Sequence, residues 1–371
     1  MRITIDASPL LLRSAGVKNY IYYWLANLVL SRGENSVSTF PLLDNAGALN
    51  HEASVLGPLE TIPRLALLYW VNLPGSWTLN WMNRNADLFH ATNQIHKAPR
   101  GAKLTATLFD MTCFLMPEFH TTGNIAAEKH FSAMLKQACS LISISENTKQ
   151  DAVKILGLDA AKIKTIYPGI PETFFQVTDA AAAATAMRYQ RGKPYILALG
   201  TVEPRKNLDT LLDAYQLLPA HLGEAFDLVL AGPMGWASME TMRRIRGGLA
   251  GVHYLGYVAE EDLPGLTKAA ALFAYPSLYE GFGLPVAQAM ACGVPVVTSC
   301  TSCLPEVSGD GALHVDPKSA SELSAALARL LESPELRARL GANGRAIAKE
   351  RYRWDLNAMQ SWKFFAEAVG T

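Results

Sequence analysis

The sequence has few cysteines, and their arrangement does not suggest a secreted, disulfide-stabilised protein. Five of its 371 residues are cysteines, scattered as Cys113, Cys139, Cys292, Cys300 and Cys303. An odd, dispersed set does not make a disulfide framework. Cys300 and Cys303 form a CxxC pair, but no second pair stands at a suitable spacing to complete a zinc site. We therefore expect reduced thiols.

The chain also lacks an apolar run long enough to cross a membrane. Its most apolar long stretch, Leu65–Trp81, is interrupted by Asn72, Pro74 and Gly75, whereas a spanning helix needs about 20 apolar residues. The first ten residues, MRITIDASPL, resemble a short strand and not a basic region followed by a secretion-signal core. These features predict a cytoplasmic protein.

A net charge is missing as well. Lys plus Arg and Asp plus Glu number 33 each, so the chain as a whole has no electrostatic attraction to nucleic acid. Half of the residues are hydrophobic and 18% are charged, which is the composition of a globular protein. A chain of this length is too long to form one ordinary hydrophobic core, so two domains are expected.

Apolar runs of strand length alternate with longer helical patterns, as in a parallel sheet with crossover helices. The predicted strands are Arg2–Asp6, Asp87–Ala91, Lys103–Phe109, Ser140–Ser145, Tyr195–Leu199, Asp227–Ala231, Ala271–Tyr275 and Val294–Thr298. The main predicted helices are Tyr20–Leu30, Glu146–Leu156, Leu208–Leu218, Met239–Leu249, Pro285–Cys292, Ala320–Leu331 and Pro334–Glu350.

The alternation pauses near Asp179, where an alanine-rich segment precedes a polar one, and then restarts. The pattern predicts an α/β fold of two doubly wound, Rossmann-like domains facing a central cleft, with ligands at the carboxyl ends of the strands. We place the first domain at residues 1–175, the second at 176–352 and a C-terminal helix at 353–371.

The segment Glu280–Gln288 (EGFGLPVAQ) follows a predicted strand and opens a predicted helix. Gly281 and Gly283 remove side chains where the backbone approaches a ligand closely, and Pro285 suits the first turn of a helix. The backbone N–H groups from Phe282 onward would point out of the helix start, which is an anion site.

Glu280 stands just outside that helix start. A carboxylate is a poor phosphate ligand but a good acceptor for sugar hydroxyl groups. The plain alternative is a helix start with glycine turn chemistry and a solvated glutamate, because short glycine motifs are common.

A second motif, Gly200–Asn207 (GTVEPRKN), follows the predicted strand Tyr195–Leu199. Arg205 and Lys206 would lie at the carboxyl end of that strand, where two cations suit a diphosphate. A solvated basic turn is the alternative. Because the chain has no Asp-x-Asp pair for a divalent ion, these cations and the helix start would neutralise the leaving group without a metal.

Taken together, these motifs make the sequence resemble the GT-B retaining glycosyltransferases of family GT4, over nearly the whole chain and most specifically in its C-terminal half. Further stretches carry the resemblance: Leu255–Leu263 (LGYVAEEDL), Met290–Val297 (MACGVPVV), Leu304–Val307 (LPEV) and Ser143–Asn147 (SISEN). EPRKN and SISEN are similar to the mannosyltransferase branch.

The resemblance implies a donor-binding second domain and an acceptor-binding first domain, with the helix Trp354–Ala368 crossing back onto the first. Glu280 would bind donor-sugar hydroxyls, and Arg205 and Lys206 the phosphates; with Asp110 these are the predicted catalytic residues. The remaining predicted donor-binding residues are Gly16, Gly200, Tyr257, Val258, Gly281, Phe282, Gly283, Leu284 and Gln288.

Two positions depart from the family pattern. Gln288 stands where the family usually has a glutamate for the ribose hydroxyls, and its amide lacks the charge-assisted strength of a carboxylate. Phe109 stands where a histidine usually precedes Asp110, and it cannot hydrogen-bond. Asp110 itself is equally well interpreted as a functional residue or as a cap of a helix or turn. His90 and His96 lie nearby, but a lone histidine is more often structural.

Two aromatic stretches, Tyr20–Trp24 and Tyr69–Trp81, could line an acceptor groove or rest on a membrane surface. Packing in the core is the favoured interpretation of both, because aromatic residues at helical spacing usually face a core.

The sequence therefore predicts a metal-independent, cofactor-free, retaining transferase that uses a nucleotide sugar, with GDP-mannose as the first donor candidate and a UDP-sugar as the alternative. The acceptor would be a glycan or lipid-linked sugar in polysaccharide assembly, in the cytoplasm or at the inner face of the membrane. A non-catalytic nucleotide-sugar binder is the competing interpretation. An NAD-type oxidoreductase is disfavoured because no GxGxxG follows the first strand of either half.

Overall fold

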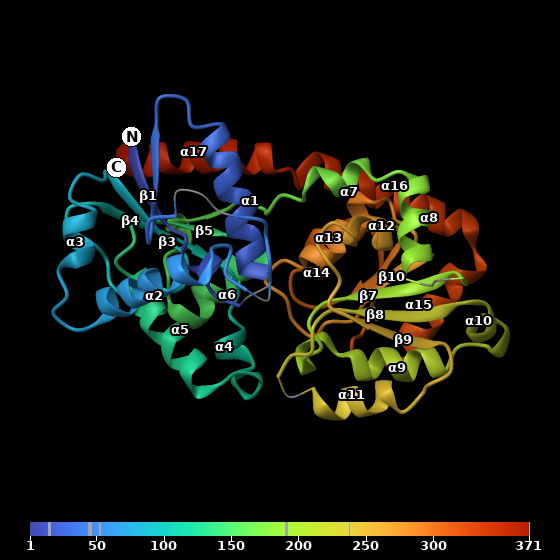
Figure 1. Ribbon diagram of the computed structural model, residues 1–371. Coiled ribbons are helices and arrows are strands. Elements are labelled where there is room, and N and C mark those ends of the chain that lie inside the picture. Colours follow the sequence, from blue (N-terminus) through green and yellow to red (C-terminus); the bar gives the residue numbers. More distant parts are fainter. Residues whose placement is uncertain (14–15, 44–46, 52, 190–191, 237, 371) are drawn as a thin grey trace. The chain divides into compact units, whose positions relative to one another are not determined.

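The computed structural model describes residues 1–13, 16–43, 47–51, 53–189, 192–236 and 238–370 (Figure 1). The chain forms two compact units. Unit 1 contains residues 1–169 and 354–371, and unit 2 contains residues 170–353. The first boundary therefore lies six residues before the predicted one, and the segment after residue 353 belongs to unit 1.

Unit 1 is built on a six-stranded, all-parallel sheet in the order β2-β1-β3-β4-β5-β6. Its strands are β1 (Arg2–Asp6), β2 (Ser36–Phe40), β3 (Leu88–Ala91), β4 (Lys103–Leu108), β5 (Ser140–Ser143) and β6 (Ile163–Thr165). Its helices are α1 (Gly16–Leu30), α2 (Pro58–Asn72), α3 (Thr78–Met82), α4 (Thr112–Leu115), α5 (Thr122–Leu135), α6 (Glu146–Leu156) and α17 (Trp354–Gly370).

Unit 2 has a second six-stranded parallel sheet in the order β12-β11-β10-β7-β8-β9. Its strands are β7 (Tyr195–Leu199), β8 (Asp227–Ala231), β9 (Val252–Gly256), β10 (Leu272–Tyr275), β11 (Val296–Ser299) and β12 (Ala312–Val315). Its helices are α7 (Glu172–Gln176), α8 (Asp179–Arg188), α9 (Leu208–Gln216), α10 (Ala220–Ala225), α11 (Met239–Arg246), α12 (Leu263–Lys268), α13 (Leu284–Ala291), α14 (Leu304–Ser308), α15 (Ala320–Glu332) and α16 (Pro334–Arg351).

Two parallel sheets with crossover helices confirm the predicted fold of two Rossmann-like domains. The inner strands β1, β3, β7, β8 and β10 are buried along most or all of their length, as expected when helices cover both faces of a parallel sheet. Helix α13 starts one residue before the predicted Pro285, and α9 ends two residues before the predicted Leu218.

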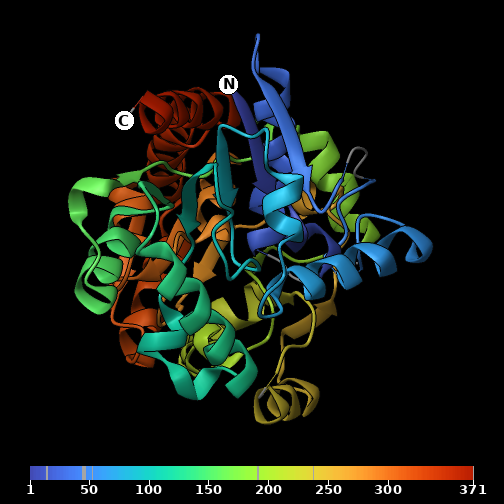
Figure 2. The ribbon, with the colours of Figure 1, turned by 90° about the vertical axis from the view of Figure 1, so that its left-hand side faces the viewer.

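The last helix, α17, packs on α1 in unit 1 (Figures 1 and 2). The indole N–H of Trp24 donates a 3.0 Å hydrogen bond to the Ser361 hydroxyl, and the Trp24 ring also contacts the ring of Phe365. The segments before residue 170 and after residue 353 therefore complete one core.

The two aromatic stretches differ in burial. Tyr20 and Trp24 on α1 are buried, which confirms core packing for the first stretch. The prediction is wrong for the second, because Tyr69, Trp70 and Trp81 are each more than half exposed. Helical spacing reports which side chains share a face, but it does not tell which face the rest of the chain covers.

Candidate functional site in unit 2

The two predicted motifs of unit 2 leave neighbouring strands of the sheet. Strands β7 and β10 pair directly, although they are far apart in the chain, because β8 and β9 extend the sheet on one side and β11 and β12 on the other. The direction of the strand order reverses between β7 and β10. Loops at the carboxyl ends of such a pair diverge, and they form the usual ligand crevice of an open α/β sheet.

The loop after β7 positions the two cations. Pro204–Lys206 forms a single 3₁₀ turn that ends at Asn207, which has a left-handed backbone (φ 57°). Asparagine tolerates this conformation. Its side chain also fixes the loop, since Nδ2 donates to the carbonyl oxygens of Pro276 at 3.0 Å and Pro317 at 2.6 Å. Asn207 thereby ties the β7 loop to the β10 loop.

The two cations converge on one carboxylate. Arg205 Nη1 lies 2.7 Å from Glu280 Oε2, and Lys206 Nζ lies 2.7 Å from Glu280 Oε1. The hydroxyl groups of Tyr275 and Ser277 also donate to Oε1, at 3.0 and 2.6 Å. We call these five residues, with Glu203, the Glu280 cluster.

The cluster is electrically balanced before any ligand arrives. Arg205 Nη2 binds Glu203 Oε1 at 2.7 Å, so two cations face two carboxylates. Glu280 Oε1 already accepts three hydrogen bonds, while Oε2 accepts one, from Arg205. Because a carboxylate offers about four acceptor positions, Oε2 retains the capacity to bind a hydroxyl group.

Burial and charge act in opposite directions on these groups. Burial alone would raise the pKa of Glu280, but Arg205 and Lys206 outweigh it and lower the pKa to about 2. The pKa of Lys206 is lowered, first by burial and then by Arg205. Burial and the Glu280 charge raise the pKa of Tyr275 well above its usual value. Glu280 is therefore ionised, and Tyr275 protonated, at neutral pH.

The start of α13 lies beside the cluster. Gly283 precedes the helix with a left-handed backbone (φ 85°), and a Cβ placed there would lie 2.8 Å from Leu304 Cδ2. Within the described residues, the N–H groups of Gly283 and Leu284 have no hydrogen-bond partner. The start of this helix can therefore hold an anion with its backbone and partial positive charge.

The other predicted donor-site residues of unit 2 lie near the same edge of the sheet. Gly200 follows β7, and a Cβ there would contact the Lys206 side chain at 3.6 Å. Gln288 is buried on α13, four residues beyond Leu284. Tyr257 and Val258 follow β9, the edge strand next to β8; Tyr257 is 41% exposed and Val258 is buried. Their predicted roles with the nucleotide stay predictions.

The predicted residues of unit 1 are described within that unit alone. Gly16 is the first residue of α1 and is exposed. Asp110 follows β4, and its Oδ1 accepts hydrogen bonds from the backbone N–H, at 2.9 Å, and the hydroxyl of Thr112. It therefore holds the turn that leads into α4, in keeping with the interpretation of Asp110 as a cap or turn residue. Its catalytic role stays a prediction.

The two histidines near this position differ in environment. His90 is fully buried between the hydroxyl groups of Thr105 and Thr107, at 2.9 and 2.8 Å, and burial lowers its pKa to about 3. It is a neutral structural residue. His96 stacks on His130. Phe109 packs edge-on against Tyr20 at 5.3 Å, so its ring takes part in a packed aromatic group.

Sequence reasoning assigned no role to three members of the cluster. Glu203 lies inside the quoted GTVEPRKN motif, and Tyr275 and Ser277 lie at the carboxyl end of the predicted strand Ala271–Tyr275. Their position at a strand end was the available signal. Tyr275 and Ser277 contact Glu280 locally, whereas Glu203 joins the cluster through Arg205, whose approach to Glu280 depends on the pairing of β7 with β10. The sequence did not indicate that pairing.

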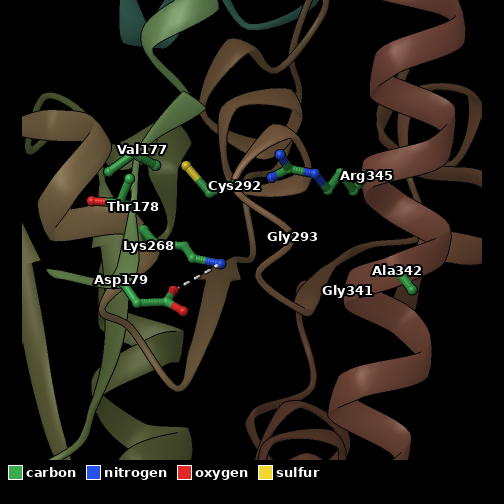
Figure 3. Close-up of a pocket in the computed structure, with 9 residues that line it drawn as sticks. All are labelled: Val177, Thr178, Asp179, Lys268, Cys292, Gly293, Gly341, Ala342 and Arg345. Carbon is green, nitrogen blue, oxygen red and sulfur yellow. Dashed lines mark ion pairs between the residues drawn. The ribbon is translucent and has the colours of Figure 1, made fainter. Parts of the chain in front are cut away.

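A separate hollow of about 470 Å³ lies at the other end of α13 (Figure 3). Its cations are engaged in structural contacts. Lys268 pairs with Asp179 at 3.4 Å, and Arg345 donates to the backbone carbonyls of Ala291 and Phe175. The arginine thus satisfies the C-terminal end of α13, as basic side chains commonly do.

The part of the chain that the structure describes lacks a metal-binding cluster and a membrane-spanning helix. It has no group of three histidine, cysteine, aspartate or glutamate side chains placed to hold a metal ion. None of its helices combines the length and apolarity needed to cross a bilayer. The five cysteines, as expected, form no disulfide.

Comparison with known proteins identifies the family. The model of "Glycosyl transferases group 1" matches residues 186–347, which include the whole Glu280 cluster. The O-antigen chain mannosyltransferase B of Escherichia coli is 31% identical over 373 residues, covering 96% of this chain and 97% of the relative. The chain belongs to the group 1 glycosyltransferases. It is an enzyme of the GT4, mannosyltransferase-like type that the motifs predicted.

Two further comparisons agree with this assignment. A GDP-mannose-dependent phosphatidylinositol monomannoside mannosyltransferase of Mycobacterium tuberculosis is 31% identical over 210 residues, covering 53% of this chain and 54% of the relative. The structure of the HepE protein of Anabaena, solved with UDP-glucose, aligns with a TM-score of 0.74 at 19% identity, covering 99% of this chain and all of the other. The latter likeness shows the GT-B fold.

Proposed function

We propose that this glycosyltransferase transfers mannose from GDP-mannose to a glycan or lipid-linked acceptor in surface-polysaccharide assembly. The mannosyltransferase names of the relatives support the sugar. The observation that carries the reaction is the placement of Arg205, Lys206 and Glu280 beside the start of α13.

In this proposal the diphosphate lies at the start of α13, against the N–H groups of Gly283 and Leu284. Arg205 and Lys206 supply positive charge as the diphosphate leaves, and the free acceptor position of Glu280 Oε2 binds a donor hydroxyl. Because two carboxylates already offset the two cations, the backbone amides and the helix dipole carry part of the neutralisation. No divalent metal is required.

No carboxylate in the Glu280 cluster is free to act as a nucleophile, because Glu280 and Glu203 are both held by cations. We therefore propose retention of the anomeric configuration by attack on the same face as the departing diphosphate, whose oxygen would accept the acceptor's proton. The enzyme would position the substrates and stabilise charge.

The test is a donor screen with GDP-mannose, UDP-glucose and UDP-galactose, following release of the nucleoside diphosphate and transfer to polysaccharide fragments, with and without EDTA. We expect turnover with GDP-mannose, an α-linked product and no effect of the chelator. Turnover only with a UDP-sugar would refute the donor assignment, and loss of activity in EDTA would refute the metal-free mechanism.

A second candidate is a nucleotide-sugar binder without transferase activity. Phe109, which packs against Tyr20, and Gln288 both replace polar groups that the family uses, and they favour it. Saturable binding of GDP-mannose by calorimetry, with neither release nor transfer in the donor screen, would establish this alternative.

A further inference from the structure

The segment that leads into α13 is anchored on a tyrosine close to the end of unit 2. Tyr352 follows α16 and is fully buried. Its ring packs edge-on against the ring of Phe282, with the two centroids 5.2 Å apart and the planes at 88°. Phe282 is also buried, and it stands between Gly281 and Gly283. The one side chain between the two glycines of the motif is therefore held by Tyr352.

This anchor matters because glycines cannot fix a loop by side-chain packing. Glycine also loses more conformational freedom on folding than any other residue, and Gly283 has a left-handed backbone (φ 85°). Phe282 is thus the side chain that ties the turn before α13 to the rest of unit 2. Without it, the N–H groups of Gly283 and Leu284 would lose their fixed direction.

Tyr352 also holds the helix that lies against this segment. Its hydroxyl group donates a 2.8 Å hydrogen bond to the carbonyl oxygen of Val307 in α14, and α14 packs against α13 (Figure 1). Just before α14, Ser302 Oγ accepts a 3.1 Å hydrogen bond from the backbone N–H of Glu280, and the Cys303 thiol donates to the Glu280 carbonyl at 3.1 Å. Tyr352 therefore supports the donor motif directly and through α14.

The backbone of Tyr352 joins this group to the two chain segments that leave unit 2. Its carbonyl oxygen accepts a 2.9 Å hydrogen bond from the N–H of Ile170, the first residue of the unit. Ile170 and Arg353 form an isolated parallel β-bridge. One residue further along each segment, a side chain at Gly169 would collide with the backbone of Trp354. The two segments thus run side by side next to Tyr352.

We propose that Tyr352 is a positioning residue of the donor site. Through Phe282 it fixes the direction of the backbone N–H groups at the start of α13, and it ties that direction to the paired segments that leave unit 2. Because Tyr352 is fully buried, it acts without touching the donor. The inference rests on the proposed diphosphate site, and such support is needed because a misplacement of about 1 Å can cost about 10²-fold in rate.

Core packing alone is the competing role, and unit 2 offers a matched comparison. Tyr195, the first residue of β7, is buried as well, and its hydroxyl group donates to the carbonyl oxygen of Leu266 at 2.6 Å. It lies at the amino end of its strand, whereas the donor loops leave the carboxyl ends. The same substitution at Tyr195 and at Tyr352 removes the same kind of buried ring and hydrogen bond, but only the change at Tyr352 should disturb the donor loop.

The first test is the affinity of the full chain for GDP and for UDP, measured by calorimetry. Tyr352→Leu removes the ring that Phe282 packs on and should weaken nucleotide binding about tenfold, whereas Tyr352→Phe keeps the ring and should bind within about twofold of the wild type. Phe282→Leu breaks the same contact from the other side and should weaken binding as much. The double variant should add little, because both changes remove one contact.

The controls are Tyr195→Leu and Tyr195→Phe, which should melt at lower temperature but bind nucleotide as the wild type does. Equal weakening by Tyr195→Leu and Tyr352→Leu would show that the loss follows stability alone and would overturn the inference. Wild-type affinity of both Tyr352→Leu and Phe282→Leu would also overturn it. The two variants attack the contact from opposite sides, so the test does not depend on the folding of one of them.

Hydrogen exchange without nucleotide separates this inference from the proposed reaction. The amides of Val286 and Ala287 bond to the carbonyl oxygen of Gly283, and they should exchange faster in Tyr352→Leu than in the wild type or in Tyr195→Leu. Faster exchange in a protein whose wild type binds neither GDP nor UDP would refute the proposed donor site but support the positioning of the loop. Unchanged exchange in Tyr352→Leu would overturn the inference.

Discussion

Each unit has a six-stranded parallel sheet with one reversal of strand order, but the two reversal points are chemically opposite. In unit 2 the reversal between β7 and β10 holds Glu280 between two cations, which lower its pKa to about 2. In unit 1 it lies between β1 and β3, where Asp6 accepts hydrogen bonds from Ser8 and Thr92 and is fully buried. Burial, opposed by these hydrogen bonds, raises the pKa of Asp6.

A second, half-buried carboxylate in unit 1 follows the same rule. Burial and the neighbouring charge of Asp110 raise the pKa of Glu128 to about 7. Among the described residues, no basic side chain forms an ion pair with Asp6 or with Glu128. Two parallel sheets with helices between their strands thus contain a charged, cation-held carboxylate in one unit and carboxylates biased toward neutrality in the other. The partners that the loops supply decide the difference.

The largest effect is expected from removing the cation-held carboxylate. Glu280→Ala should lower kcat/KM for transfer about 10²–10³-fold, because it removes the hydroxyl acceptor and leaves Arg205 and Lys206 unbalanced. Glu280→Gln, which keeps the shape, should lose most of that activity with a smaller change in melting temperature. Full activity of both variants would show that Glu280 does not serve the reaction; Glu322→Ala, on the outside of α15, is the control.

Removing one of the two cations should have a smaller effect. Lys206→Met keeps the apolar stem and should reduce kcat about 10–100-fold through weaker stabilisation of the leaving diphosphate. In the wild type, the cation-held Glu280 stabilises the folded state above pH 4.5, and this stabilisation is lost as the pH falls toward 2. With one cation its pKa rises, so acid unfolding should begin at higher pH in the variant, as circular dichroism would show. If acid unfolding begins at the same pH in the variant and the wild type, Lys206 contributes little to lowering the pKa of Glu280.

Glu128 should have the opposite effect on the pH dependence of stability. Below pH 4.5 this carboxyl group is protonated in both the folded and the unfolded state. Between pH 4.5 and 7 only the folded state keeps the proton. The folded state is therefore destabilised as the pH rises through this range. Glu128→Gln should stabilise the protein by about 1–3 kcal/mol at pH 8 and by little at pH 4.5. Urea unfolding at the two pH values measures this; equal effects at both would contradict the raised pKa.

The smallest effect concerns the amide on α13. Gln288→Glu should lower the KM for the donor about two- to fivefold if this side chain meets the ribose, since a carboxylate forms stronger hydrogen bonds with hydroxyl groups than an amide does. Steady-state kinetics at fixed acceptor concentration would show it. A raised KM would place Gln288 away from the nucleotide, and Gln216→Glu, at the end of α9, controls for the added charge.

The strands that the sequence predicted are the inner strands of both sheets, and the four it missed are the edges. β1, β7 and β8 have the predicted bounds, because strands covered on both faces are continuous apolar runs. β2 and β9 contain half-exposed and polar positions and give no such run. Edge strands depend on pairing with a neighbour, which a local pattern does not report.

The candidate site could likewise be predicted only in part. Glu280, Arg205 and Lys206 could be predicted because each lies in a local motif at a strand end. Their mutual binding could not, because it follows from contacts over more than 70 residues of chain. The exposure of Tyr69–Trp81 was likewise hidden, since it depends on what the rest of the chain leaves uncovered.

The docking of α17 on unit 1 has a consequence for dissecting this enzyme into fragments. Unit 2 is one continuous segment, whereas unit 1 is assembled from both chain ends. A fragment ending at Gly169 would expose the surfaces of Trp24 and His90 that Phe365 covers and should aggregate. An isolated unit 1 should instead be made by joining residue 169 to residue 354 through a short linker, so that unit 2 is removed as an insert.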